Sequence, residues 1–161
     1  MLRVKEFSKD RLYGLLLRIE KIKWFLFRPD IVSARIMLVC GDKVLLVQHR
    51  GSRTWNLPGG GVPIGEDPEL GALRELREET QIIVDHADGL LHSVDHEKGH
   101  YRSKTYVFIK RVDREYLIKC SFEIRDAAWV SMSALPEKTS AATRQRIFEY
   151  QASLRNARMS A

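Results

Sequence analysis

The stretch WNLPGGGVPIGEDPELGALRELREETQI, residues 55–82, decides the fold, because it joins a glycine turn to a well-marked acidic helix. Asp67 suits the N-cap, and Pro68 takes the first helical position, where its missing N–H costs nothing. The helix is predicted to run to about Thr80. Its apolar residues Ala72, Leu73 and Leu76 lie on one side and are expected to face the core.

A different side of this helix is a candidate metal site. At about 100° per residue, Glu75, Glu78 and Glu79 fall within roughly 100° of arc, on the same side as Gly71. Like charges one turn apart destabilise a bare helix by about 0.2–0.5 kcal/mol per pair, which an Arg74–Glu78 pair partly offsets. Clustered carboxylates suit Mg²⁺ or Mn²⁺. The competing interpretation is a solvated helix face with ordinary salt bridges.

The preceding glycine turn strengthens the metal interpretation. Gly59, Gly60 and Gly61 offer backbone N–H and C=O groups that can approach a metal or a phosphate closely, since no Cβ intervenes. The turn is not a P-loop, because no Gly-Lys-Ser/Thr follows it. A glycine turn that leads into an acidic helix predicts metal-assisted phosphate chemistry.

Together the turn and the helix resemble the box of the Nudix hydrolases, Gly-x5-Glu-x7-Arg-Glu-U-x-Glu-Glu-x-Gly-U, where U is bulky and apolar. The residues that match the box in register are Gly60, Glu66, Arg74, Glu75, Leu76, Glu78, Glu79 and Ile82. Gln81 departs from it, since the box has glycine there. A left-handed residue is often needed near a helix C-terminus, and glutamine would cost about 1 kcal/mol in that conformation.

The resemblance implies an α/β (α+β) fold, an α/β/α sandwich around a mixed sheet, and hydrolysis of a nucleoside diphosphate linked to another group. The implied metal ligands are Glu75, Glu78, Glu79 and the Gly59 carbonyl, with Mg²⁺ as the ion and Mn²⁺ as its alternative. The implied catalytic residues are Glu75, Glu78 and Arg74, which orients the glutamates. Gly60, Gly61 and Glu66 are implied as substrate contacts. The general base lies either in the box or outside it, for instance in residues 91–101.

The rest of the chain predicts further strands and helices. Strands are expected at 33–40, 43–48, 82–85, 90–95, 104–111 and 127–130, and helices at 8–27 and 139–155. Strands interrupted by helices predict a layered fold. The domain plan is an amphipathic N-terminal helix in residues 1–30, as an extension, and a Nudix domain in 31–161. The apolar face of that helix can cover its own domain, a partner in a homodimer, or a membrane surface.

Composition bounds the other possibilities. The 161 residues suit one domain, and no apolar run approaches the ~20 residues of a membrane span. Two isolated cysteines, Cys40 and Cys120, predict reduced core residues of a cytoplasmic protein. The net charge of +6 lies in the flanks, with +4 in residues 1–30 and +3 in residues 137–161. Basic flanks can attract RNA or lipid headgroups, although most are solvated helix faces.

Three functions therefore compete. The first is a small-molecule nucleotide pyrophosphohydrolase, whose substrate and leaving group the sequence does not identify. The second is removal of pyrophosphate from RNA 5′ ends, and the third is a catalytically silent Nudix-like binding module. A zinc site in the histidine-rich residues 91–101 is disfavoured, because their spacing matches no common zinc pattern.

Overall fold

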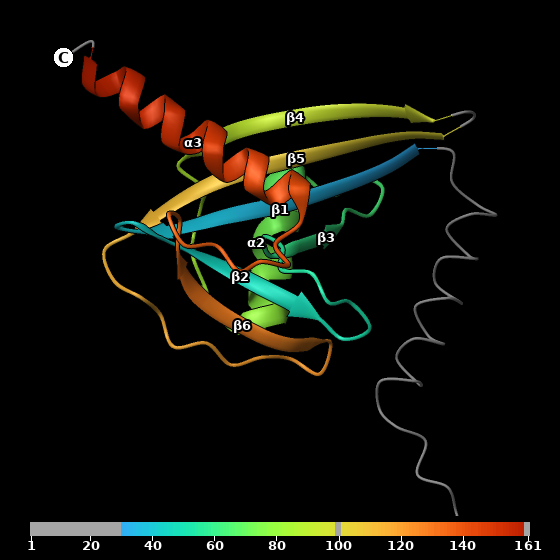
Figure 1. Ribbon diagram of the computed structural model, residues 1–161. Coiled ribbons are helices and arrows are strands. Elements are labelled where there is room, and N and C mark those ends of the chain that lie inside the picture. Colours follow the sequence, from blue (N-terminus) through green and yellow to red (C-terminus); the bar gives the residue numbers. More distant parts are fainter. Residues whose placement is uncertain (1–29, 99–100, 160–161) are drawn as a thin grey trace, which may run out of the picture.

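The computed structural model describes residues 30–98 and 101–159, shown as the coloured ribbon in Figure 1. The predicted helix at 8–27 lies outside the described residues. The strands are β1 (Asp30–Cys40), β2 (Lys43–His49), β3 (Gly59–Gly61), β4 (Gly89–Lys98), β5 (Tyr101–Val112) and β6 (Ile124–Ser131). The helices are α2 (Pro68–Thr80) and α3 (Ala141–Met159). The acidic helix has the limits that the sequence predicted.

The strands form one mixed sheet in the order β4-β5-β1-β2-β6, with β3 paired to β1. The β1–β5 pair is parallel, and the other pairs are antiparallel. Strand β1 serves two partners along one edge. Its residues Ser33, Ala34 and Arg35 pair with the glycines of β3, and its end pairs with β2. The glycine turn is thus hydrogen-bonded directly to the central sheet.

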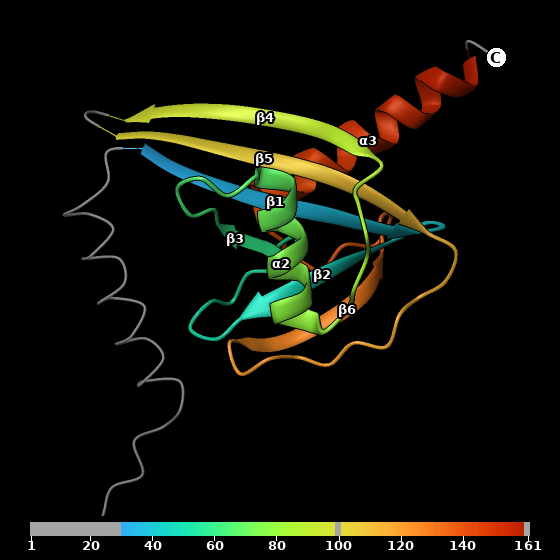
Figure 2. The same ribbon diagram turned by 180° about the vertical axis from the view of Figure 1, so that it is seen from behind.

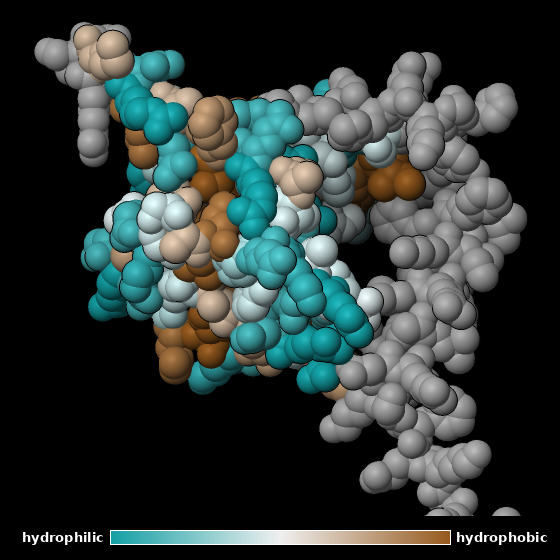
Figure 3. All heavy atoms as spheres, viewed as in Figure 1, coloured by the Kyte–Doolittle hydropathy of each residue, from teal (hydrophilic) through white to brown (hydrophobic). Residues whose placement is uncertain are grey.

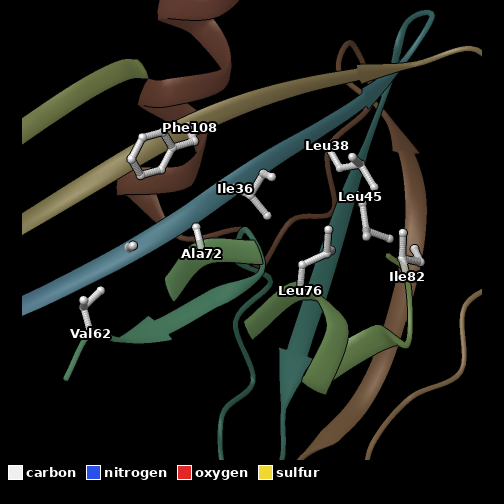
Figure 4. Close-up of a cluster of buried hydrophobic side chains, with 9 residues drawn as sticks. Ile36, Leu38, Leu45, Val62, Ala72, Leu76, Ile82 and Phe108 are labelled. Atoms are coloured by element: carbon white, nitrogen blue, oxygen red, sulfur yellow. The ribbon is translucent and has the colours of Figure 1, made fainter. Parts of the chain in front are cut away.

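A helix covers each face of the sheet, as the two opposite views show (Figures 1 and 2). Alternate residues of β1 point to opposite faces, as the pleat of a strand requires. Ile36 and Leu38 pack in a cluster with Ala72 and Leu76 of α2, as Figure 4 shows. Met37 and Val39 pack in a second cluster, whose members from α3 are Ile147 and Tyr150. The predicted α/β/α sandwich is confirmed.

One predicted strand was wrong, and one strand was not predicted. Residues 82–85 form no strand, since the N–H of Ile82 bonds to Thr80 Oγ1 at 3.2 Å and the side chain of Ile82 enters the core. Conversely, the glycine turn contains the strand β3, which composition does not suggest because glycine has a low strand propensity. It pairs because β1 offers a free edge there.

The exposure of side chains tests the predictions about the cysteines and about membrane-spanning segments. Both cysteines are free, but Cys120 is exposed, so the prediction that it is a core residue was wrong. Seen from the α3 side, a narrow stripe of hydrophobic residues (brown) runs between hydrophilic ones (Figure 3). Among the described helices, none is long and apolar enough to cross a bilayer.

Candidate active site

The glycine turn is held tightly against β1. The N–H of Ile36 bonds to the Pro58 carbonyl at 3.0 Å, and the N–H of Val62 bonds to the Val32 carbonyl at 2.9 Å. Gly59 has φ 139°, and a Cβ there would lie 2.2 Å from the Ala34 carbonyl oxygen. Only glycine fits this position, because any side chain at residue 59 would collide with the backbone of β1.

Helix α2 is fixed at both ends. The Asp67 carboxylate accepts hydrogen bonds from the N–H groups of Glu69 at 2.8 Å and Leu70 at 3.2 Å. At the other end, the backbone carbonyls of Glu79 and Thr80 accept hydrogen bonds from residues 121 and 119. Because the apolar side of α2 is buried against the sheet, its acidic side is turned toward the glycine turn.

Arg74 gathers the acidic side chains of this face. Its Nε and Nη2 donate to the two carboxylate oxygens of Glu66 at 2.8 and 2.9 Å. Its Nη1 donates to Glu75 at 2.9 Å and to Glu78 at 3.1 Å, and Nη2 also donates to the Gly61 carbonyl at 3.0 Å. The bond from Arg74 holds the pKa of Glu66 below its usual range. Arg74 therefore ties the helix to the loop that precedes it.

The carboxylate of Glu75 lies against the glycine turn. A Cβ at Gly60 would come within 2.6 Å of the Glu75 carboxylate carbon, so glycine leaves the room that this side chain uses. Burial raises the pKa of Glu75, and the nearby charges of Glu79 and Glu78 raise it further, against the opposing effect of Arg74. A partly buried carboxylate beside two others is a favourable place for a cation.

Glu79 is the buried member of the acidic set, with 3% of its surface exposed. One carboxylate oxygen accepts a hydrogen bond from the Gly59 N–H at 3.1 Å, and the other lies 2.6 Å from Nε2 of His49. In the neutral tautomer that carries its proton on Nε2, His49 donates to this carboxylate oxygen. His49 ends β2, and it fixes Glu79 beside the glycine turn.

Arg35 supports the same turn from the sheet. Its Nη1 donates to the carbonyls of Leu57 at 2.8 Å and Gly59 at 3.3 Å. Burial lowers the pKa of Arg35, and the charges of Glu79 and Glu75 oppose that change. The guanidinium of Arg35 thus lies against the carbonyls of the turn, and its positive charge is attracted by the two carboxylates.

The structure divides the predicted metal ligands into two groups. Glu75, Glu79 and Gly59 meet at the glycine turn, whereas the Glu78 side chain is 53% exposed and bonded to Arg74. In the described part of the chain, no three acidic, histidine or cysteine side chains have the arrangement of a metal site. The donor chemistry nevertheless fits a hard divalent ion, because the carboxylates of Glu75 and Glu79 both lie against the glycine turn, at Gly60 and at Gly59. The room at Gly71 is taken by Glu66, whose carboxylate would lie 3.0 Å from a Cβ there.

Sequence reasoning missed Arg35 and His49. A signal for Arg35 existed, since a charged residue inside the apolar run 34–40 must have a buried partner. No comparable signal marked His49, which lies 30 residues from Glu79 in the chain. The histidine-rich residues from 92 to 98 lie on β4, and their side chains are outside the described set.

Comparisons with known proteins agree with this geometry. The NUDIX domain model matches residues 30–151, which include all the described strands, α2 and the first part of α3. Nudix hydrolase 7 of Arabidopsis thaliana is 32% identical over 127 residues, covering 68% of this chain and 45% of that protein. The RNA pyrophosphohydrolase of Acinetobacter baylyi (strain ATCC 33305 / BD413 / ADP1) is 37% identical over 60 residues, covering 37% of this chain and 35% of that protein. The chain thus spans less than half the length of these relatives.

A solved structure extends the likeness to three dimensions. The MutT protein from Methanosarcina mazei Go1 superposes with a TM-score of 0.64 at 27% sequence identity. The match covers 80% of this chain and 97% of that chain. The likeness therefore extends over most of the chain and over nearly the whole of that protein.

Proposed function

This chain belongs to the NUDIX family, and we propose that it hydrolyses a pyrophosphate linkage in a nucleoside diphosphate derivative with a divalent metal ion. The observation that carries the proposal is the meeting of two carboxylates at one glycine turn. Glu79 is bonded to the Gly59 N–H, and Glu75 fills the space beside Gly60. The small-molecule substrate and a cytoplasmic location belong to the same proposal.

In this proposal Glu75, Glu78, Glu79 and the Gly59 carbonyl hold Mg²⁺, with Mn²⁺ as the alternative. The ion would supply charge neutralisation for the anionic diphosphate and lower the pKa of bound water. Arg74 orients Glu75 and Glu78 through the bonds of its Nη1. Glu75 and Glu78 are the candidates to accept the proton of the attacking water. The backbone of Gly60 and Gly61, with Glu66, lines the approach of the substrate.

The test is a phosphate-release screen over a nucleotide library, with a coupled phosphatase and with or without Mg²⁺. We expect Mg²⁺-dependent turnover that falls by at least about 100-fold in Glu79→Gln, since several kcal/mol of charge stabilisation is lost. The matched control is Glu137→Gln, which removes an exposed carboxylate between β6 and α3.

Two results would contradict the proposal. Full Mg²⁺-dependent turnover in Glu79→Gln would show that the metal site has been assigned to the wrong residues. No turnover of any nucleotide by the wild type would favour the catalytically silent binding module. Thermal unfolding of each variant in EDTA separates a lost site from a lost fold, because the fold itself needs no added metal in this scheme.

Hydrolysis at RNA 5′ ends is the second candidate. It is favoured by the similarity to an RNA pyrophosphohydrolase and by the basic flanks of the chain, +4 in residues 1–30 and +3 in 137–161. If it is right, RNA binding weakens steeply as salt is raised, because phosphate contacts release counterions. RNA binding whose affinity does not change with salt argues against this candidate.

Two further predictions concern partners of the chain. A homodimer is tested by sedimentation, and membrane association of residues 1–30 is tested with anionic vesicles.

A further inference from the structure

The segment 55–59, which leads into the glycine turn, is hydrogen-bonded at every residue. Asn56 exchanges two backbone bonds with β2, and the next two carbonyls accept bonds from residues of β1. Gly59 ends the segment, and its N–H donates to Glu79. These anchors belong to the sheet and to α2. The remaining anchor, at Trp55, comes from the residues just before α3.

Trp55 pairs with the turn that precedes α3. Its N–H donates to the Lys138 carbonyl at 2.9 Å, and its carbonyl accepts a bond from the Ser140 N–H at 3.0 Å. The two chains run parallel here, in an isolated bridge between Trp55 and Thr139. We call residues 136–140 the clamp. The clamp thus holds the chain directly before it enters the glycine turn.

One side chain, that of Arg144 in the first turn of α3, gathers the carbonyls of the clamp. Its Nη2 donates to two of them and its Nε to a third. They are the carbonyls of Pro136 at 2.5 Å, Glu137 at 3.0 Å and Thr139 at 3.3 Å. A guanidinium carries five donors in a rigid fork, so it can serve several carbonyls at once. The carbonyl that Arg144 leaves out, at Lys138, is the one that accepts the Trp55 N–H.

The turn and the helix that Arg144 joins also have bonds of their own. The turn is closed by its backbone, since the Thr139 N–H donates to the Pro136 carbonyl at 3.0 Å. Helix α3 has its own cap, because the Ser140 hydroxyl accepts a bond from the Thr143 N–H at 3.3 Å. The side chain of Arg144 therefore adds a fixed orientation of the turn on the helix.

The helix that carries Arg144 is itself fixed to the sheet. Ile147, about one helical turn further on, is buried in the cluster that joins α3 to the sheet, and Leu57 belongs to the same cluster. Groups that bind a metal must be held within about 0.5 Å of their working positions by neighbours that are themselves fixed. Bonds that hold Trp55 to the start of α3 therefore limit where the glycine turn can lie.

We propose that Arg144 is a positioning residue of the active site. Through the clamp it holds the segment 55–59 so that the Gly59 N–H stays bonded to Glu79. Arg144 acts through the backbone of the clamp and of Trp55, not by contact with the substrate. This inference rests on the proposed function, in which Gly59 and Glu79 are metal ligands.

The first experiment measures amide hydrogen exchange of the full chain in EDTA, residue by residue, by NMR. In Arg144→Gln the amides of Trp55 and Gly59 exchange at least about tenfold faster than in the wild type, because the bonds that protect them open more often. Amides of β5 change by no more than the loss of global stability, which urea unfolding of the same proteins measures. The control Arg155→Gln makes the same chemical change at an exposed position of α3 and keeps the wild-type rates.

Two outcomes of this experiment overturn the proposal. Equal exchange of the Gly59 amide in wild type and Arg144→Gln means that the clamp does not hold the glycine turn. Exchange that rises by the same factor at Gly59 and throughout β5 means that Arg144 only stabilises the fold.

The second experiment connects the clamp to the metal site, by titration of the full chain with Mn²⁺. Arg144→Gln raises the Kd for Mn²⁺ about tenfold, as expected when the support of a metal ligand is lost, and Arg155→Gln keeps the wild-type Kd. Unchanged Mn²⁺ affinity in Arg144→Gln, together with faster exchange at Gly59, overturns the role in the site. If the wild type binds no Mn²⁺ and hydrolyses no nucleotide, the proposed function fails, whereas the exchange experiment still decides whether Arg144 positions Gly59.

Discussion

Single glycines of the turn have different tasks, although they are adjacent. A Cβ at Gly59 meets the backbone of Ala34, and φ there is 139°. The atoms nearest a Cβ at Gly60 belong to the carboxylate of Glu75, the end of a flexible side chain, and φ of Gly60 lies outside the left-handed region. Gly59 is therefore required by the fold, and Gly60 by the site.

We expect Gly59→Ala to lower the free energy of unfolding by about 2–5 kcal/mol, through backbone strain and collision. Gly60→Ala is expected to change it by less than about 1 kcal/mol while weakening Mn²⁺ binding about 10- to 100-fold, because Glu75 is displaced. Urea unfolding and Mn²⁺ titration measure the two quantities. An equal loss of stability in both variants would contradict the inference that the fold requires Gly59 and the site requires Gly60.

Gln81 adopts the left-handed conformation that the resemblance called for. Its φ is 59° and its N–H bonds to the Arg77 carbonyl at 2.8 Å, so the helix ends as a glycine would end it. We expect Gln81→Gly to stabilise the protein by about 0.5–1 kcal/mol, which raises Tm by about 1–4 °C. The control Gln81→Ala keeps the strain and should leave Tm unchanged. Thermal unfolding decides, and a lower Tm in the glycine variant would refute the strain argument.

At the scale of elements, Arg74 and Glu66 join α2 to the loop that precedes it. Since the pKa of Glu66 is lower in the folded protein than in the unfolded chain, the unfolded chain binds more protons as pH falls. The stability from this pair is present above the unfolded pKa, about 4.3, and is lost as pH falls through the folded pKa.

Glu66→Gln should therefore be less stable than the wild type at pH 7, on the order of 1 kcal/mol after solvent screening. The difference should shrink to nothing in strong acid, because the wild-type carboxylate is then protonated too. Urea unfolding of both proteins from pH 7 to pH 3, with Glu137→Gln as the control, measures it. A difference that stays constant over this range would rule out the ionised pair.

At the scale of the whole molecule, α3 is attached to the sheet by a few buried side chains. Ile147 is 1% exposed and shares a cluster with Met37 and Leu57, whereas its neighbour Phe148 is 63% exposed. Leu57 lies two residues before the glycine turn, so this cluster also supports the site from beneath.

We expect Ile147→Ala to lower the free energy of unfolding by about 2–5 kcal/mol through the cavity it leaves. Phe148→Ala, one residue further along α3, should change it by less than about 1 kcal/mol, because the ring is already in water. The pair is compared by urea unfolding. Similar losses in both variants would mean that α3 packs on the sheet with a different face.

The sequence by itself determined whatever depends on neighbours within a few residues. The limits of α2, its Asp67 cap and the gathering of its glutamates on one face follow from the helical repeat and from cap chemistry, which act locally. The tertiary structure alone decided which glutamate meets which partner. The bond from His49 to Glu79 and the pairing of β3 with β1 join residues about 20–30 positions apart, and their geometry depends on how the sheet is assembled. The wrong prediction of a strand at 82–85 has the same cause. A short apolar run does not by itself show whether it pairs with a neighbouring strand or only buries its side chains in the core.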